Sequence, residues 1–500
     1  MRCPNRTTIL IVGGLSLGID ACATVGPNFV PPAATTAPVY VMAGDPAPSS
    51  MILSPENRSA GPWWQALGSP QLDAVMSEAL QGNQTLAAAQ STLDQAQVEV
   101  QRALLVARSP QISTTAGASR ERINTSAFGF SGFPGFPAFS SPTINLFSVG
   151  AGVSYDMDVA GGARRRVEAA GALEAAQGFR TDAAYLSLTG NVALQAVRIA
   201  GARAQIDALR AIEADDRAII DIDRKAEAAG GSSPSAGTGD RAQLSQDEAQ
   251  MPVLAQNLAQ ARHALALLVG KPSSQWTAPD FAFAQFNPPS AIPVAIPSDL
   301  VRNRPDILAA EADLHADTAR IGVAKADFYP DVKLTANFTQ MSLRPSTFFN
   351  YGASGWNFGP SLTMPILGAR SRRVHLAVAE TQARTSMARY RQTVLAAFAQ
   401  VADVLTALSH DDEMLAVDDR YEQESQGGLR DAQSNVRLGG GAPLAEVEAH
   451  RRVERARFNR IDTQTRRLMD VVQLYAATSA VEPPRSGGRD GAHSEAVGGR

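Results

Sequence analysis

The sequence is poor in cysteine, since its 500 residues include only Cys3 and Cys22. Cys3 lies in a segment that we expect to be removed on export. The mature chain would then keep one cysteine and could form no internal disulfide. A chain exported without disulfides must obtain its stability from packing and assembly.

Long hydrophobic runs are also absent. No stretch reaches the roughly 18 apolar residues of a membrane-spanning helix, so we expect no transmembrane helix. The one apolar run near the start, Ile9 to Ile19, follows Arg2 and Arg6 and is too short to span a membrane. A basic segment followed by a short apolar run is typical of a secretory signal peptide, which we place at residues 1–21.

Cys22 directly follows this run, after Ile19, Asp20 and Ala21. The arrangement looks like a bacterial lipoprotein processing site, where the cysteine becomes the first residue and carries diacylglycerol and palmitate. Asp20 departs from that pattern, because such sites usually have a small or apolar residue there. A plain signal peptide with an incidental cysteine is the alternative. By the same resemblance, Ala23 after the cysteine favours export to the outer membrane.

Signatures of catalysis and of nucleic-acid binding are missing. The six histidines do not pair at metal-ligand spacing, and the sequence has neither a nucleotide-type glycine-rich loop nor a Gly-x-Ser-x-Gly elbow. The formal net charge of −4 gives no support for nucleic-acid binding. We therefore predict no enzyme, no metal and no cofactor other than lipid on Cys22, and we expect any energy to come from a partner.

What the chain does contain is a duplication. Tyr155 to Val167 returns as Leu362 to Val374, and in both copies an alternating strand passes through a glycine turn into a long helix. Upstream, at Pro110 and Pro330, a helix gives way to a strand, because proline cannot continue a helix. Each half is predicted to be a helix, a strand, a loop, a strand, a very long helix and a return helix.

Each half contains one predicted β-hairpin, at about residues 111–158 and 331–365. In the first, the apolar residues of Val149 to Met157 alternate with small or polar ones, after a Phe-, Gly- and Pro-rich loop at 128–142. Strands of about ten residues can cross a bilayer, and one apolar face with one small or polar face is typical of a transmembrane β-barrel. The alternative is a soluble hairpin that buries one face.

Four strands are too few to close a barrel, and lipid does not tolerate open strand edges. Because the smallest such barrels have about eight strands, several chains must contribute. We predict a mixed α+β membrane protein, internally duplicated, with four transmembrane strands per chain. Three chains would form a twelve-stranded barrel that continues into a long antiparallel α-helical barrel.

The predicted helices are long. One helix is expected from Ser69-Pro70 to about Arg108. Another runs from Gly162 to about Lys225, roughly 95 Å, and returns at 240–269. The second half repeats this at 371–438 and 444–478, as antiparallel hairpins suited to coiled-coil packing.

These patterns divide the chain into six parts. They are a signal peptide at 1–21, a lipid-anchored extended segment at 22–65, a first repeat at 66–270, an equatorial linker at 271–297, a second repeat at 298–480 and a disordered tail at 481–500.

Several segments resemble the outer-membrane efflux proteins, the TolC-like channels. They are Ile296 to Ile307, Ile321 to Pro330 and Leu265 to Pro272, and Cys22 to Pro27 resembles the start of the NodT-type lipoprotein branch. The resemblance extends from residue 22 to about 478. It implies a homotrimeric duct in the outer membrane of a Gram-negative cell, anchored by lipid and extending into the periplasm. A periplasmic adaptor (membrane fusion) protein and an inner-membrane transporter would dock on it.

Two departures from the family pattern concern the end of the last helix and the periplasmic tip. Leu474 to Ala480 replaces the usual Ala-Leu-Gly-Gly-Gly-Trp stretch. Gly441 stands where the resemblance predicts an acid of the constriction ring; the nearest carboxylates are Asp431 and Glu446, with Asp240 at the first tip. A ring of one such carboxylate per chain would favour cations. The alternative role is a solvated helix-end charge, with Asp240 as an N-cap.

The helical tips are the adaptor contacts that the resemblance implies. The candidate residues are Gly230, Gly231, Arg437, Gly439 and Gly440, although tight turning is an alternative role for the glycines.

Arginine clusters at 164–166 and 372–373 follow the predicted strands. They could bind headgroup phosphates or pair with Glu168 and Asp158, and we favour a role at the joint between strand and helix.

We therefore predict a passive exit duct of a tripartite efflux system for small molecules such as drugs and toxic compounds. The alternatives are an exit channel for protein or peptide, and a periplasmic coiled-coil lipoprotein scaffold without a channel.

Overall fold

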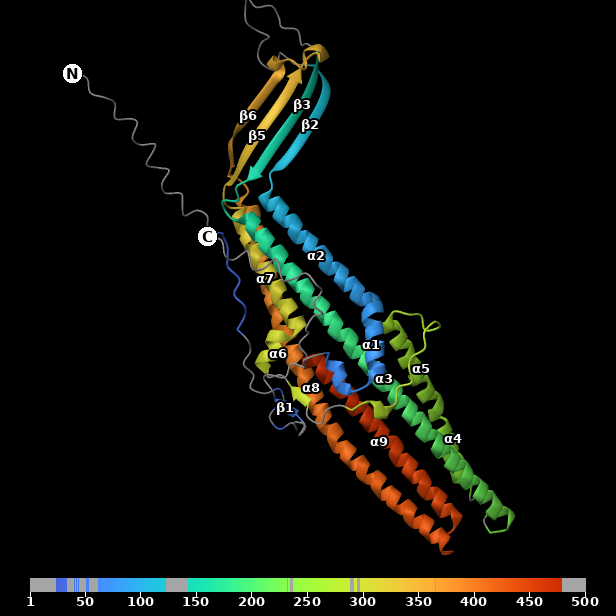
Figure 1. The fold of residues 1–500 in the computed structure, drawn as a ribbon. Coiled ribbons are helices and arrows are strands. Elements are labelled where there is room, and N and C mark those ends of the chain that lie inside the picture. Colours follow the sequence, from blue (N-terminus) through green and yellow to red (C-terminus); the bar gives the residue numbers. More distant parts are fainter. Residues whose placement is uncertain are drawn as a thin grey trace, which may run out of the picture. The chain divides into compact units, whose positions relative to one another are not determined.

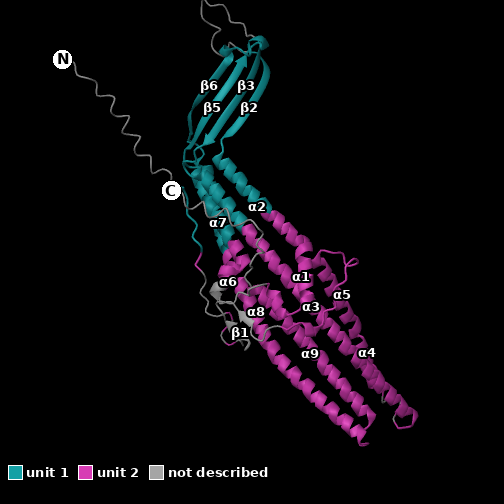
Figure 2. Ribbon diagram, viewed as in Figure 1, with its two compact units in different colours: residues 1–31, 94–175, 311–388 teal, residues 32–93, 176–310, 389–500 magenta. Residues whose placement is uncertain are grey.

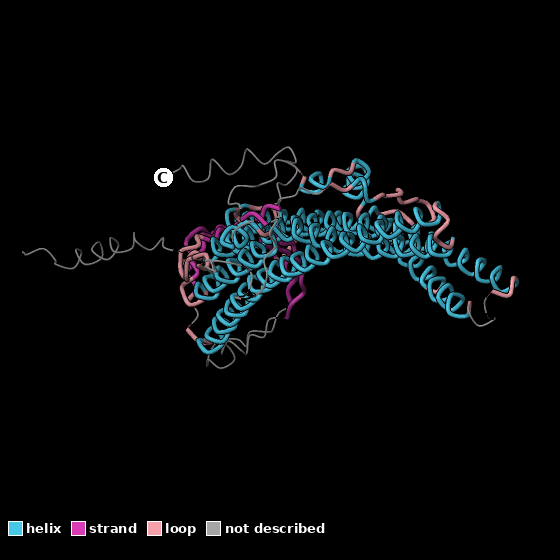
Figure 3. The backbone as a smooth tube through the Cα atoms, turned by 90° about the horizontal axis from the view of Figure 1, so that it is seen from below, coloured by secondary structure: helices cyan, strands magenta, loops and turns pink. Residues whose placement is uncertain are grey.

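The computed structural model describes residues 24–33, 40, 42, 44, 51–53, 62–122, 143–231, 233, 237–287, 292–294, 297–364 and 366–478. Cys22, the predicted signal peptide, the predicted loop at 128–142 and the predicted tail at 481–500 lie outside these residues. Within the described part of the chain, helices make up most of the backbone (Figure 3).

The chain divides into two compact units (Figure 2). The first combines residues 1–31, 94–175 and 311–388, and the second combines residues 32–93, 176–310 and 389–500. Each unit takes segments from both halves of the duplication. The sequence repeats are therefore not the compact units, because equivalent segments of the two repeats pack against each other.

The first unit contains a four-stranded antiparallel sheet in the order β2-β3-β5-β6 (Figure 1). The strands are β2 at Gln111–Arg122, β3 at Thr143–Asp156, β5 at Asp331–Ser342 and β6 at Ser354–Thr363. β3 from the first repeat pairs with β5 from the second, so the hairpins of the two repeats form one continuous sheet. β2 and β6 are the two edge strands.

The register places the apolar residues of all four strands on one face. Ile112 pairs with Val153, Val153 pairs with Ala336, and Ala336 pairs with Phe358. Directly paired residues of an antiparallel sheet project to the same side. The neighbouring row on this face consists of Thr114, Ala151, Phe338 and Trp356, and a row on the opposite face consists of Ser113, Gly152, Asn337 and Asn357. The predicted alternation is confirmed.

The described helices include two that are very long. The α-helices are α1 at Pro70–Gly82, α2 at Gln84–Arg108, α3 at Gly162–Ala228, α4 at Thr238–Glu248, α5 at Gln250–Val269, α6 at Pro297–Asn303, α7 at Pro305–Ala326, α8 at Ala369–Arg437 and α9 at Pro443–Thr478. With 67 and 69 residues, α3 and α8 are each about 100 Å long.

The prediction of one continuous helix from Ser69 to Arg108 is wrong, because the helix breaks at Asn83 into α1 and α2. The Asn83 side-chain Oδ1 accepts a hydrogen bond from the Leu86 backbone N–H at 2.9 Å, which caps α2. Its Nδ2 donates to the Leu268 carbonyl oxygen on α5, also at 2.9 Å. The break therefore docks the α1–α2 corner onto the end of the return helix.

The predicted return helix at 240–269 is also broken, at Ala249 between α4 and α5. Pro252 lies in the first turn of α5 and has no N–H to donate back to Glu248, so the helical ladder is interrupted there. Pro305 similarly begins α7 directly after α6 has ended at Asn303. The apolar spacing of the sequence continues past these prolines, but the helix ends there because proline lacks the N–H that would continue it.

One described helix, α8, contains an 18-residue stretch whose mean hydropathy of 1.3 would allow it to cross a membrane by length and composition. Its buried residues recur at intervals of three or four. They include Val394, Ala397, Val401, Leu405 and Leu408. This spacing indicates a helix that packs one face into a core, rather than one that is apolar all round.

The core of the second unit is built from helices packed closely along small residues. Ile206 and Leu209 of α3 pack against Leu254 of α5. At Gly201 of α3, an added Cβ would lie 2.5 Å from Oγ1 of Thr465 on α9. α3 and α9 therefore approach more closely than a side chain at residue 201 would allow.

A short parallel pair of strands was not predicted. β1 at Met51–Leu53 pairs with β4 at Ile292–Val294, which lies in the predicted linker. Three-residue strands give too weak a sequence pattern to detect.

Candidate functional site

The most unusual surface of the first unit is the apolar face of its sheet. Trp356 is 77 % exposed, Ile112 is 72 % exposed and Phe358 is 68 % exposed. Exposed large apolar side chains in register across four strands are costly in water and suit contact with lipid. The opposite face carries serine, glycine and asparagine in the paired row, which suits contact with water.

The joint between β3 and α3 is fixed by Asp158, whose φ of 43° lies in the left-handed region. Its carboxylate accepts hydrogen bonds from the backbone N–H groups of Ala163 at 2.7 Å and Arg164 at 3.0 Å. A carboxylate at the N-terminal end of a helix also offsets the positive end of the helix dipole. The first turn of this very long helix is therefore anchored to the end of the strand.

The arginine cluster at 164–166 lies at the same joint. Arg164 Nε lies 3.2 Å from Asp158 Oδ2, and Arg165 Nη1 lies 2.6 Å from Glu168 Oε2. The pairing with Asp158 and Glu168, which was the alternative to a role at the joint, is thus observed, and it lies at that joint. In the second repeat, the Arg372 guanidinium lies 5.8 Å from the centre of the Phe328 ring.

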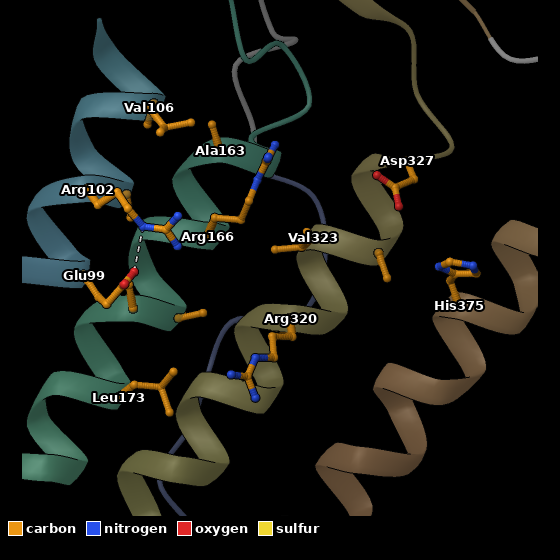
Figure 4. Close-up of a pocket in the computed structure, with 15 residues that line it drawn as sticks. Glu99, Arg102, Val106, Ala163, Arg166, Leu173, Arg320, Val323, Asp327 and His375 are labelled. Carbon is orange, nitrogen blue, oxygen red and sulfur yellow. Dashed lines mark hydrogen bonds and ion pairs between the residues drawn. The ribbon is translucent and has the colours of Figure 1, made fainter. Parts of the chain in front are cut away.

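A cavity of about 530 Å³ lies in the first unit among α2, α3, α7 and α8 (Figure 4). Its wall combines apolar side chains with charged ones, including Arg102, Arg166 and Arg320. Arg102 is paired with Glu99 at 2.8 Å, and Arg320 is paired with the buried Asp317 at 2.5 Å. Much of the positive charge around the cavity is therefore already compensated.

The described residues contain no group of three or more histidine, cysteine, aspartate or glutamate side chains that could hold a metal ion.

The tip glycines complete the C-terminal caps of the long helices. Gly230 after α3 has φ 73°, and Gly439 after α8 has φ 74°. The N–H of Gly231 donates to the Ala226 carbonyl at 2.8 Å, and the N–H of Gly440 donates to the Asn435 carbonyl at 3.0 Å, as in a Schellman cap. The turning role is thus observed. All four glycines are exposed, and so is Arg437, whose guanidinium bonds to its own helix.

The three gate candidates have different surroundings. Asp240 lies in the first turn of α4 but is not its N-cap, which is Gly237, so the expected capping role was wrong. Instead, Asp240 Oδ1 lies 3.7 Å from Arg451 Nη1 on α9. Asp431 is exposed on α8, and Glu446 lies in the first turn of α9.

A buried charge network near the first tip was not found from the sequence. Asp216 of α3 and Asp247 of α4 both have fully buried side chains. Arg451 donates to Asp216 at 2.9 Å, and Arg455 donates to Asp247 at 2.5 Å. These ion pairs tie α9 to both helices of the first hairpin. Aspartates inside a long polar helix looked like solvated charges, and only the packing shows that they are buried.

The two buried aspartates influence each other, and their pKa values move in opposite directions, with that of Asp216 raised and that of Asp247 lowered. Burial raises the pKa of Asp216, and the neighbouring Asp247 carboxylate acts in the same direction. Oδ2 of Asp216 is buried and has no hydrogen-bond partner. When it is protonated, Asp216 can donate a hydrogen bond to the Asp247 carboxylate, whose own pKa is lowered.

A second acidic pair lies between α8 and α9. Burial, followed by the nearby charge of Asp411, raises the pKa of Asp470 to about 6. The pKa of Asp411 is also raised, mainly by burial, and its Oδ2 is buried without a partner. Close by, Asp412 pairs with Arg467 at 2.5 Å, so adjacent residues of α8 have opposite electrostatic roles.

Comparison with known proteins gives a consistent result. The family model described as outer membrane efflux protein matches residues 75–271 and 296–480. The pyoverdine export outer membrane protein OpmQ of Pseudomonas putida is 28 % identical over 471 residues, which cover 93 % of this chain and 95 % of that protein. The cation efflux system protein CusC of Escherichia coli K12 is 26 % identical over 452 residues, covering 88 % of this chain and 95 % of that protein.

Solved structures share the fold. The outer-membrane channel OprN superposes with a TM-score of 0.79 at 24 % identity, covering 92 % of this chain and 99 % of the other. A CusC structure superposes with a TM-score of 0.75 at 24 % identity, covering 92 % of this chain and 100 % of the other. The mixed architecture of a four-stranded sheet with long helices is therefore the fold of outer-membrane channels.

Proposed function

Because the chain belongs to the outer membrane efflux protein family, we propose that it is the outer-membrane exit duct of a tripartite efflux system. Three copies form a twelve-stranded barrel in the outer membrane of a Gram-negative cell, and their long helices form an α-helical barrel in the periplasm. Small molecules pass through it passively. The export, cation-efflux and toluene-efflux names of its relatives indicate that cargo varies within the family.

The observation that carries this proposal is the incomplete sheet. β2 and β6 leave two edges open, and the face that includes Trp356 and Phe358 is apolar and exposed. A lipid-embedded sheet must close, since an unpaired backbone group in hydrocarbon costs several kcal/mol, on the order of a lost hydrogen bond. Antiparallel pairing of β6 with β2 of a neighbouring copy satisfies both edges. A scaffold held only by lipid would leave this face in water.

The partners follow from the lack of an energy source. The sequence has no nucleotide-binding loop, so an inner-membrane transporter supplies the drive and a periplasmic adaptor docks at the tips around Gly230, Gly231, Arg437, Gly439 and Gly440. The three gate candidates, Asp240, Asp431 and Glu446, would bring carboxylates to the pore once per protomer.

Cys22 is the proposed site of diacylglycerol and palmitate. Labelling cells with a palmitate analogue should mark the wild-type chain and not the Cys22→Ala variant.

Conductance of the purified protein in a planar bilayer tests the duct. We expect discrete conductance steps, reduced by divalent cations if a carboxylate ring lines the tip. A correctly folded oligomer that never conducts, even after Asp240, Asp431 and Glu446 are all replaced by the matching amides, would argue against a pore. Deleting the gene and measuring both drug susceptibility and secreted protein separates small-molecule export from protein export.

A further inference from the structure

Residues 24–29, which directly follow the proposed lipid site, lie against the joint between the sheet and the helices of the first unit. The backbone N–H of Val25 donates a hydrogen bond to the Ala160 carbonyl at 3.2 Å, in the turn between β3 and α3. The segment was predicted to be an extended tether. Its first described residues are docked on the unit, and the docking involves the buried Arg165 and two partly buried polar groups that the duct function does not use.

Arg165 of α3 is the centre of this site and is only 3 % exposed. Its guanidinium donates to the Val25 carbonyl at 3.2 Å, to the Gly26 carbonyl at 3.4 Å and to Asn28 Oδ1 at 2.8 Å. The remaining charged partner is Glu168, at 2.6 Å. A guanidinium has five N–H donors, and buried donors without acceptors are costly. The N-terminal segment therefore supplies acceptors that Arg165 needs.

The second repeat supplies the other wall of the site. His315 of α7 stacks on the Phe29 ring, with centroids 4.4 Å apart and an interplanar angle of 13°. The same histidine lies 3.0 Å from Oε1 of Glu168 through its Nε2. Glu168 thus joins Arg165 of the first repeat to His315 of the second, and the N-terminal segment covers both.

Shape makes the site selective for this segment. A Cβ at Gly26, whose φ is 98°, would lie 2.5 Å from the Gly322 Cα on α7. A Cβ at Gly322 would lie 2.7 Å from Cγ of Arg165. At Gly26 the contact is with backbone and φ is positive, so this position requires glycine. At Gly322 a Cβ would push against the side chain of the buried Arg165.

We propose that Arg165, Glu168 and His315 form a cradle that binds residues 24–29 and fixes the N-terminus at the β3–α3 joint. The function of this cradle, which is to position a membrane anchor, rests on the proposed lipid at Cys22. Two residues can span at most about 7 Å, so a lipid on Cys22 would be confined to within about this distance of Thr24. Because the cradle needs α3 and α7 together, the anchor takes this place only after the two repeats have packed.

The test uses the full-length chain purified from membranes. A nitroxide is attached at Ala23→Cys, and amide hydrogen exchange of the peptide that contains Val25 is followed. Arg165→Met, Gly26→Ala and Asn28→Ala should mobilise the label, and the first two should speed exchange at Val25 at least about tenfold, because hydrogen bonds of about 1.4 kcal/mol or more in total are lost. Arg166→Met is the matched control, since Arg166 is exposed and its Nε donates to the Gly162 carbonyl of its own helix at 3.2 Å.

The two segment variants change no helix, so they carry the test if Arg165→Met does not fold. An immobile label in both Gly26→Ala and Asn28→Ala, together with unchanged exchange in Gly26→Ala, would overturn the cradle. Labelling stoichiometry separates this result from the lipid proposal. After removal of the signal peptide with Cys3, acylated Cys22 leaves one free thiol in the Ala23→Cys chain. Two labels per chain, or three if the signal peptide is retained, would reject lipidation without affecting the cradle.

Discussion

At the scale of single residues, ionisable groups buried between helices decide how the protein responds to pH. The pKa of Asp470, raised to about 6, means that the folded state holds a proton more tightly than the unfolded chain does. Stability from this group is fully present below its ordinary pKa of about 3.9 and is lost as pH rises through about 6. At neutral pH, two carboxylates then face each other across α8 and α9.

Asp470→Asn should therefore stabilise the protein at pH 7.5, by roughly 1 kcal/mol once solvent screening of this half-buried group is allowed for. The gain should vanish near pH 4, which a thermal-unfolding series from pH 4 to 8 would measure. Asp412→Asn is the matched control with the opposite sign, because it removes the partner of Arg467. Equal effects of Asp470→Asn at pH 4 and pH 7.5 would contradict a raised pKa of Asp470.

At the scale of elements, the two faces of each strand have different solvents. Phe358 and Asn357 are neighbours in β6 and belong to opposite faces by register. Phe358→Arg should destabilise the folded, membrane-inserted state by about 2–4 kcal/mol if the residue is near the bilayer midplane. Asn357→Arg should fold normally. Folding yield in detergent or lipid vesicles measures both, and equal tolerance of the two arginines would remove the lipid-facing assignment.

Also at the scale of elements, buried ion pairs hold α9 against the first helical hairpin, α3 and α4. Arg451→Met removes the cation beside the fully buried Asp216 and near Asp240. Breaking a buried pair costs about 3–5 kcal/mol when the remaining charge cannot be neutralised, and protonation of Asp216 should reduce that cost. We expect faster hydrogen exchange in α4 and the facing part of α9. Arg452→Met, at the adjacent exposed position, should leave exchange unchanged.

At the scale of the whole molecule, the open edges of the sheet require other copies. The chain has a mass of 52.7 kDa, and we expect purified protein to have about three times this mass in detergent after correction for bound detergent. The oligomer should also migrate differently on gels before and after heating. A monodisperse monomer that is soluble without detergent would contradict the twelve-stranded barrel.

Much of this architecture is visible in the sequence, because its periodicities are long and regular. Val149 to Tyr155 alternate with period two, and the strand found there is β3. The long helix expected from Gly162 to about Lys225 is α3, ending at Ala228. The breaks at Asn83 and Ala249 were missed, because apolar periodicity continues across both and only packing against α5 or the missing N–H of Pro252 ends the helix.

The candidate site was less predictable, because its residues act through burial. Arg165 was one of three adjacent arginines in the sequence, and nothing distinguished it from Arg164 or Arg166. In the structure Arg165 alone of the three is buried, and it binds the N-terminal segment. Asp216 is likewise the same residue type as its neighbour Asp215. The two differ in the side of α3 on which they lie, and only the Asp216 side chain is fully buried.

The sequence by itself determined the duplication, the two-faced strands, the long helices and the likeness to outer-membrane efflux proteins. These are local or periodic properties. Apolar residues repeat every two positions in a strand and every three to four in a helix, so both patterns can be read from the order of residues. Tertiary structure alone decided that β3 pairs with β5 across the repeats, that Asp216 and Asp247 are buried beside Arg451 and Arg455, and that residues 24–29 are held by Arg165. Each of these depends on contacts between residues far apart in the chain, where burial rather than residue type sets the energy of a charge or an open hydrogen bond.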